Sequence, residues 1–263
     1  MAALLAFHGE DEGAQLRLRD DLGNDDLIPV ARFFRTGVDL PPLEELALQH
    51  CRGHVLDIGA GAGAHALLLQ KRGMSVSALE PHGELAEMLR QRGVERVLEG
   101  TLSDMAAAPP GPPPCVRLAG GDAQPGRRRE ERCGGGFDTL LLLMNGWGLA
   151  GSAEAFPAFL DDLESLLGSG GQILADSTTP AAFHNEEVDE AATPDDTPYP
   201  GNVQFQWEFQ GRKGAPFPFL FLDPERLSQL AEHRGWKVEI LAETDGGAYL
   251  SRLTRPERVK DAG

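Results

Sequence analysis

Apolar and polar positions along the chain predict strands and helices in alternation. Short apolar runs rich in Val, Ile and Leu predict strands at residues 54–58, 75–79, 94–99, 137–144 and 172–176. Between these runs, helix-forming stretches, several of them closed by glycine, predict helices at residues 64–70, 83–91 and 153–167. Strands that alternate with helices indicate a doubly wound sheet with right-handed crossovers.

The last part of the chain predicts one helix and two further strands. Asp223 and Pro224 suit the N-cap and the first position of a helix, and Gly235 suits its end. Residues 236–242 and 248–254 then predict two strands, which have to be antiparallel neighbours because the link between them is short. The elements together predict an α/β fold, with a mostly parallel sheet that ends in an antiparallel strand and carries helices on both faces.

We interpret residues 1–263 as a single domain with additions at two places. Residues 1–52 predict a helical extension, because Pro41 and Pro42 suit a helix start, although the first part of this segment shows little periodicity. Residues 177–222 predict an insertion on the substrate side, in which alternating aromatic and polar residues indicate a half-exposed strand of a small hairpin.

The rest of the domain is a core and a closing unit. Residues 53–176 form the predicted cofactor-binding core, and residues 223–255 form the closing helix and strand pair. Within the core, residues 106–136 are rich in proline and glycine and predict a surface loop without regular structure.

Composition limits the classes of partner. The chain has 41 acidic and 24 basic residues, a net charge of −17, and so acidic a surface disfavours a nucleic-acid substrate. No apolar run reaches the roughly 18 residues of a membrane helix, and the start lacks the basic region of a signal peptide. Cys51, Cys115 and Cys133 match no metal-ligand spacing and suit free thiols, so we expect a cytoplasmic protein and predict no metal site.

The most informative stretch is HVLDIGAGAGAHALLLQ, residues 54–70. Residues 59–63 read Gly-Ala-Gly-Ala-Gly and join the first core strand to its helix. So bare a backbone lets a ligand approach closely, and the helix start offers free N–H groups. Asp57 precedes the turn and Glu80 ends the next strand. Close helix–strand packing without a ligand explains the glycines equally well, so this motif alone does not decide whether the turn binds a ligand.

A dinucleotide site is one class of cofactor site that fits this arrangement. Gly59, Gly61 and Ala64 have the required spacing and Glu80 is the acid on the next strand, which predicts an NAD-dependent oxidoreductase. Two features oppose this interpretation. Asp57 occupies a strand end where dinucleotide sites usually have an apolar residue, and the predicted antiparallel pair is absent from a plain dinucleotide fold.

The motif VLDIGAGAG, residues 55–63, resembles the first motif of the class I S-adenosylmethionine-dependent methyltransferases. The resemblance covers residues 53–254 and includes the strand order. It implies a Rossmann-like sheet of seven strands whose last strand is antiparallel. The runs LLLMNGWGL at residues 141–149 and GGQILADS at residues 170–177 further resemble a bacterial subgroup of these enzymes whose substrate is unassigned.

The resemblance implies S-adenosylmethionine as the cofactor and assigns residues to its parts. Asp57 would lie near the ammonium group, and Glu80 would accept hydrogen bonds from both ribose hydroxyls, with Pro81 packed nearby. The backbone beside the amino-acid and ribose portions would come from Gly59, Ala60, Gly61 and Gly63.

The resemblance also implies residues for the adenine and the methyl group. Thr101 and Leu102 would lie near the adenine, with Thr101 at a position where the family often has an aspartate. Met144 and Asn145 would line the methyl-donor region. The segment RFFR, residues 32–35, is either a lid over the cofactor or a helix packed on the core.

Methyl transfer is an in-line displacement that mainly requires alignment and exclusion of water. A base is needed only where the acceptor loses a proton. We expect Asn145, Asp176 and Tyr199 on the acceptor side, Asp176 because it ends the fifth predicted strand. After the fourth strand the chain reads Asn-Gly-Trp-Gly, not the Asn/Asp-Pro-Pro-aromatic motif usual in nucleic-acid amino-methyltransferases.

The sequence therefore predicts an S-adenosylmethionine-dependent methyltransferase with a small-molecule acceptor, a protein side chain being the other possible acceptor. Two alternatives stay open at this point. One is the NAD-dependent oxidoreductase, and the other is a non-catalytic protein that binds S-adenosylmethionine. The sequence predicts neither the acceptor atom nor the oligomeric state.

Overall fold

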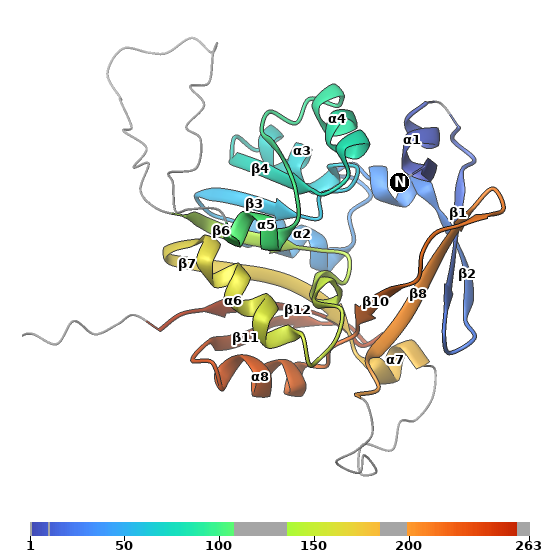
Figure 1. The fold of residues 1–263 in the computed structure, drawn as a ribbon. Helices are drawn as coiled ribbons and strands as arrows, with labels where there is room; N and C mark the ends of the chain where they lie inside the picture. Colours follow the sequence, from blue (N-terminus) through green and yellow to red (C-terminus); the bar gives the residue numbers. More distant parts are fainter. Residues whose placement is uncertain (1, 10, 108–135, 185–198, 257–263) are drawn as a thin grey trace, which may run out of the picture.

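A seven-stranded main sheet forms the centre of the computed structural model, which describes residues 2–9, 11–107, 136–184 and 199–256 (Figure 1). The strand order is β11-β12-β7-β6-β3-β4-β5. The strands are β3 (His54–Ile58), β4 (Ser75–Glu80), β5 (Val97–Glu99), β6 (Phe137–Leu142), β7 (Leu167–Thr178), β11 (Lys237–Glu243) and β12 (Ala248–Thr254). Neighbouring strands from β5 to β7 pair in parallel, whereas β12 pairs antiparallel with both β7 and β11. The predicted sheet with its antiparallel last strand is confirmed.

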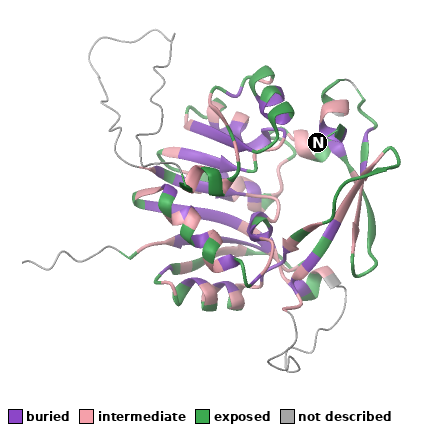
Figure 2. Ribbon diagram, in the orientation of Figure 1, coloured by how far each residue is buried: buried purple, intermediate pink, exposed green. Residues whose placement is uncertain are grey.

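The alternation of side chains in β3 separates two apolar layers. Leu56 and Ile58 pack with α5 (Leu102–Ala107), α6 (Phe156–Leu166) and α8 (Pro224–Glu232) on one face. Val55 packs with α2 (Pro42–His50) and α3 (Ala64–Lys71) on the other face, where α4 (Gly83–Gln91) adds Leu89. The strands are accordingly buried between helices (Figure 2), which confirms the prediction of helices on both faces.

A second, small sheet stands opposite the carboxyl ends of the parallel strands (Figure 1). Its order is β10-β8-β1-β2, with β9 paired to β8, and all of its pairs are antiparallel. The strands are β1 (Gln15–Asp20), β2 (Asp25–Pro29), β8 (Asn202–Phe209), β9 (Arg212–Lys213) and β10 (Phe217–Leu220). The hairpin predicted in the insertion after the fifth strand is therefore confirmed.

The predicted helical extension is wrong for residues 15–29. The helices α1 (Ala2–His8), η1 (Val30–Phe34) and α2 are present, but β1 and β2 lie between α1 and η1. Leu18 lies opposite Trp207 of β8, while Arg19 forms an ion pair with Glu208. The alternation in β1 is only six residues long, and its partner strand lies far along the chain, so local pattern did not reveal the pairing.

Three short elements complete the fold: η2 (Gly146–Ala150) after β6, α7 (Pro180–His184) after β7, and η1 before α2. The loop predicted at residues 106–136 falls almost entirely outside the described residues. Within the part of the chain that the structure describes, no helix has the length and apolar character needed to cross a membrane.

Candidate functional site

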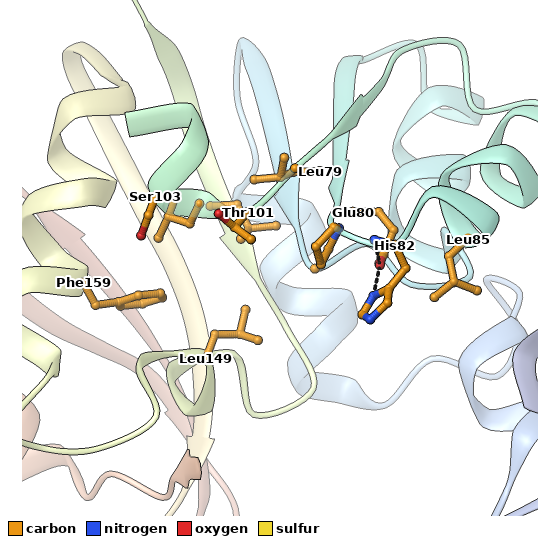
Figure 3. A pocket seen from close by; sticks show the side chains of 13 residues that line it. Leu79, Glu80, His82, Leu85, Thr101, Ser103, Leu149 and Phe159 are labelled. Carbon is orange, nitrogen blue, oxygen red and sulfur yellow. Dashed lines mark hydrogen bonds and ion pairs between the residues drawn. The ribbon is translucent and has the colours of Figure 1, made fainter. Parts of the chain in front are cut away.

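A pocket of about 450 Å³ lies at the carboxyl ends of β3, β4 and β5 (Figure 3). Three successive strand-to-helix turns supply most of its walls, and η2 and α6 add one residue each. Five lining residues were predicted from sequence: Gly59, Glu80, Pro81, Thr101 and Leu102. The lining residues that sequence reasoning missed include His82, Leu85, Leu149 and Phe159.

The glycine turn, residues 59–63, brings bare backbone to the edge of this pocket. Gly59, Gly61 and Gly63 have φ of +73°, +54° and +79°, in the left-handed region that favours glycine. The amides of Gly59 and Ala60 donate to the Leu79 carbonyl at 3.0 and 3.1 Å, which fixes the turn against β4. A Cβ on Gly63 would lie 2.5 Å from Leu89 Cδ2, whereas a Cβ on Gly61 would meet only a carbonyl at 3.8 Å. Packing therefore explains Gly63 but leaves room for a ligand beside Gly61.

Glu80 is held at the end of β4 by three hydrogen bonds. Its Oε2 accepts from the Gly61 amide at 3.1 Å, and its Oε1 accepts from the His82 amide at 3.0 Å and from His82 Nδ1 at 2.9 Å. The carboxylate is thus fixed between the glycine turn and the start of α4. Each carboxylate oxygen has two lone pairs, so these three bonds leave one lone pair, on Oε2, for a ribose hydroxyl. His82 lies two residues after Glu80 along the chain, and this spacing was a signal that sequence reasoning overlooked.

Asp57 lies beneath the glycine turn, with 2% of its surface exposed. Burial raises the pKa of Asp57, and the positive charge of His65 and the Ala66 amide oppose this shift. Its Oδ2 has no hydrogen-bond partner among the described residues. A buried carboxylate oxygen without a partner is costly, and the ammonium group of the implied cofactor is a donor that fits it.

The opposite end of the pocket is largely apolar. Leu149 and Phe159 present their side chains there (Figure 3), and Leu102 also lines the pocket. The Thr101 amide and hydroxyl both donate to Asp104, at 2.9 and 2.6 Å, so this acid fixes the start of α5. Leu149 is 50% exposed, and apolar walls of this kind suit a planar base.

A strained turn follows β6 where the resemblance implies the methyl-donor region. Met144 and Asn145 have φ of +67° and +61°, uncommon values for residues other than glycine. Asp176, on the adjacent β7, accepts from the Gly146 amide at 3.0 Å. Asn145 Oδ1 accepts from the Thr178 hydroxyl at 2.9 Å. The structure thus brings Asn145 and Asp176, two of the residues expected on the acceptor side, together at this turn.

Asp176 has an altered acidity in this turn. Burial raises the pKa of its carboxyl to about 6, although the amides of Gly146 and Asn145 oppose the shift. A carboxyl of this acidity exchanges protons near neutral pH, which suits a general base.

Among the described residues, no hydrogen bond connects Tyr199 to the turn after β6. Its hydroxyl donates to the Asp223 carboxylate, and the Asp223 amide donates back to that hydroxyl at 3.1 Å. Asp223 also caps α8 by accepting from the Arg226 amide at 2.7 Å. Burial and the hydrogen bond to Asp223 raise the pKa of Tyr199, so the tyrosine acts here as a structural partner of the α8 N-terminus.

The RFFR segment covers the outside of the glycine turn. Phe33 and Phe34 pack in one apolar cluster with Ala62 of the turn and with α4. The Arg92 guanidinium lies 4.6 Å over the Phe34 ring and donates to the Ala62 carbonyl. Residues 32–34 are helical as part of η1, Arg35 follows that helix, and the segment also lies against the predicted cofactor turn.

Comparison with known proteins identifies the class. The chain is similar to an S-adenosylmethionine-dependent methyltransferase from Bacteroides fragilis solved in complex with S-adenosyl-L-homocysteine, at 31% identity and a TM-score of 0.74. The alignment covers 97% of this chain and 93% of that one. No protein-family model and no curated protein matches the sequence.

Two further structures share the fold at lower identity. The CcbJ methyltransferase from Streptomyces caelestis is 15% identical, with a TM-score of 0.52 over 82% of this chain and 91% of that one. DesVI from Streptomyces venezuelae is 13% identical, with a TM-score of 0.51 over 81% of this chain and 90% of that one.

The chain belongs to the S-adenosylmethionine-dependent methyltransferases. It is an enzyme of this class, it has the class I Rossmann-like fold, and its cofactor is S-adenosylmethionine. The prediction of an S-adenosylmethionine-dependent methyltransferase is confirmed, and the NAD-dependent oxidoreductase is set aside.

Proposed function

We propose that this enzyme transfers the methyl group of S-adenosylmethionine to a small-molecule acceptor at the turn after β6. The observation that carries the proposal is the way the small sheet covers this turn. A Cβ on Gly148 of η2 would overlap the Phe219 ring of β10, and a Cβ on Gly151 would lie 3.3 Å from Pro218. A turn covered this closely suits a small acceptor shielded from water better than a folded polymer.

Charge and motif support the same class of acceptor. A net charge of −17 disfavours nucleic acid, and the chain lacks the Asn/Asp-Pro-Pro-aromatic motif after the fourth strand. Aromatic residues of β8 and β10, with Phe221 directly after β10, form an apolar cluster beside this turn, since Phe205 contacts Phe217, Phe219 and Phe221 with ring centroids 5.3–6.0 Å apart.

The cofactor residues divide by the part of the ligand that they would hold. Glu80 would accept a ribose hydroxyl through the free lone pair of Oε2, Asp57 would accept from the ammonium group, and the glycine turn would pass beside both. Leu102, Leu149 and Phe159 would enclose the adenine. Bound S-adenosylmethionine supplies a methyl group already activated for in-line displacement.

Asn145 and Asp176 would serve the acceptor side. Asn145 would orient the acceptor with its side-chain amide, which the Thr178 hydroxyl holds in place. Asp176 would take the proton from an acceptor atom that carries one, and a pKa of about 6 leaves its carboxylate ready for this at neutral pH.

The first experiment is calorimetric titration with S-adenosylhomocysteine and, in parallel, with NAD. We expect the wild type to bind S-adenosylhomocysteine and not to bind NAD. Glu80→Ala should lose about 1.5–3 kcal/mol of affinity, as for a lost charged hydrogen bond. Glu84→Ala, an exposed acid on α4, is the matched control and should bind as the wild type does.

An assay of S-adenosylhomocysteine formed from S-adenosylmethionine, with different candidate acceptors added, then identifies the acceptor class. Pools of small metabolites should stimulate release, and Asp176→Asn should slow it about 10²–10⁴-fold. Stimulation by a protein fraction only would contradict the small-molecule acceptor. Binding of NAD, or wild-type affinity in Glu80→Ala, would contradict the assignment of the cofactor residues.

A further inference from the structure

The two faces of the small sheet carry different kinds of side chain. Its outer face holds ion pairs, such as Arg19 with Glu208 at 2.6 Å. Its inner face, toward the main sheet, holds apolar and aromatic side chains of β1, β8 and β10, among them Leu18, Phe205, Trp207, Phe217 and Phe219. Side chains alternate between the two faces of a strand, so this inner face is one that other groups cover.

Two aromatic side chains of the inner face, Trp207 and Phe217, are covered only in part. Both residues are half-buried, whereas Phe205, two residues before Trp207 on the same face of β8, is 6% exposed. The rings of Trp207 and Phe217 stack with centroids 6.2 Å apart and 21° between their planes. The Trp207–Phe217 pair therefore keeps part of its aromatic surface free for a ligand.

The Trp207–Phe217 pair reaches toward both turns of the main sheet that serve methyl transfer. Trp207 packs against the apolar cluster that contains Ala62 of the glycine turn. Phe217 lies in the neighbouring cluster with Phe219, whose ring lies against Gly148, just after the turn that follows β6. The pair thus spans from the cofactor turn toward the acceptor turn, where the small sheet faces the carboxyl ends of the strands (Figure 1).

Asp176 supplies a negative charge at the acceptor turn, and this charge is not paired within the described chain. Asp176 is half-buried, and its carboxylate accepts from the Gly146 amide at 3.0 Å. No arginine, lysine or histidine of the described residues forms an ion pair with it. A cation that donates hydrogen bonds is the kind of ligand that suits an unpaired carboxylate.

The classes of acceptor differ in how well they suit aromatic rings together with a carboxylate. A carboxylate acceptor would meet Asp176 as a like charge. An alcohol has no positive charge for the aromatic rings to attract. An ammonium group is attracted both by the carboxylate and by the faces of the rings, and tryptophan is the strongest partner for such a cation.

We propose that the acceptor is a primary or secondary amine, bound in its ammonium form between the Trp207–Phe217 pair and Asp176. The inference rests on the proposed methyl transfer at the turn after β6 and names the substrate class of that reaction. Because the cofactor is itself a cation, the ammonium group loses a proton more readily beside it than in water.

The chemical step balances with the groups at hand. Asp176 takes one proton from the ammonium group, and the lone pair thus freed on nitrogen attacks the methyl carbon. The bond between this carbon and sulfur breaks, and its electron pair stays on sulfur. The products are S-adenosylhomocysteine and an N-methylammonium ion, and the proton on Asp176 passes to water.

The test separates a bacterial extract of small metabolites by charge before it reaches the wild-type enzyme. The fraction retained by a cation-exchange resin at neutral pH should stimulate formation of S-adenosylhomocysteine, and the neutral and anionic fractions should not. Treatment of the retained fraction with acetic anhydride, which caps primary and secondary amines, should abolish the stimulation.

Three variants test the aromatic contact with the same retained fraction. Trp207→Leu should raise the apparent KM about three- to thirtyfold at nearly unchanged kcat, with S-adenosylhomocysteine bound as by the wild type. Trp207→Phe keeps an aromatic face and should restore most of the loss. Phe209→Leu is the matched control, because Phe209 is a half-buried aromatic residue of the same strand that pairs with β9, and its KM should be that of the wild type.

Stimulation by the neutral or anionic fraction, or stimulation that survives acetylation, would overturn the inference and leave the small-molecule methyltransferase intact. Stimulation by a protein fraction only, or by no fraction, would overturn both. An unchanged KM in Trp207→Leu, or no rescue by Trp207→Phe, would overturn the contact with the aromatic pair. The fractionation uses only the wild type, so it decides the substrate class even where a variant does not fold.

Discussion

The two halves of the carboxyl edge of the main sheet are built in different ways. In the β3–β5 half, the contacts that shape the pocket join neighbouring segments, such as Gly61 with Glu80, 19 residues apart, and Glu80 with His82, two residues apart. In the β6–β7 half, Gly146 contacts Asp176 across 30 residues, and Trp147 Nε1 donates to Ser251 across 104 residues. The cofactor half is local in sequence, and the acceptor half is assembled from distant segments.

The two halves also differ in the chemical groups that they use. The cofactor half relies on backbone amides and left-handed glycines, together with one acid. The acceptor half relies on side chains of η2, β7 and β12 and on the cover of the small sheet. Four measurements test the comparison, in decreasing order of expected effect.

Gly63→Ala should give the largest loss of stability, about 2–5 kcal/mol in the free energy of unfolding. The residue combines φ of +79° with a Cβ position 2.5 Å from Leu89 Cδ2, so strain and overpacking add. Gly73→Ala is the matched control, since φ is +80° but nothing lies within 4 Å, and it should lose only about 1–2 kcal/mol. Urea unfolding of both variants measures the difference, and equal losses would contradict a packing role for Gly63.

Asp176 should make stability depend on pH in an unusual direction. Its pKa is raised from 3.8 to about 6 in the folded chain. As pH rises from about 4 to 6, the unfolded chain loses this proton first, so the free energy of unfolding falls by about 3 kcal/mol. The free energy of unfolding of Asp176→Asn should not fall in this way. Relative to the wild type, the variant should therefore become more stable as pH rises from about 4 to 6.

Urea unfolding of both proteins at several pH values checks this prediction. Asp245→Asn, an exposed acid in the β11–β12 turn, is the control and should follow the wild type at every pH. A constant offset between Asp176→Asn and the wild type would show that Asp176 titrates normally.

Ser251→Ala, in the acceptor half, should lower the free energy of unfolding by about 1–2 kcal/mol without weakening the binding of S-adenosylhomocysteine. Its hydroxyl accepts from Trp147 Nε1 at 2.9 Å and donates to the Ala175 carbonyl at 2.8 Å, and both residues are buried. Ser165→Ala on the α6 surface should change stability by less than about 0.5 kcal/mol. Thermal unfolding and S-adenosylhomocysteine titration together test whether the two halves are independent. A loss of both stability and affinity in Ser251→Ala would contradict that independence.

His82→Ala should give the smallest effect, a loss of S-adenosylhomocysteine affinity below about tenfold. The ring, 58% exposed, orients Glu80 through one of three hydrogen bonds, and two backbone amides remain in the variant. His233→Ala, on the exposed end of α8, is the control and should bind normally. The same titration measures both, and a loss as large as that of Glu80→Ala would assign the histidine a direct contact.

The sequence alone predicted the fold and most of the cofactor half. The periods of strands and helices are local properties of the sequence. The glycines at residues 59–63 indicate a turn because glycine adopts positive φ without steric cost. Glu80 followed from the end of one predicted strand, because parallel strands bring their carboxyl ends to one edge. These features depend on residues close together in the chain.

Tertiary structure alone decided the small sheet, the position of Arg35 and the partner of Tyr199. β1 pairs with β8, Arg35 meets Glu44 and His65, and Tyr199 bonds to Asp223 rather than to the turn after β6. No local pattern encodes such contacts, because pairing between distant segments depends on the burial and charge that folding creates. The sequence therefore predicted the glycine turn and the acid assigned to the cofactor, and the folded chain decided which distant segments surround them.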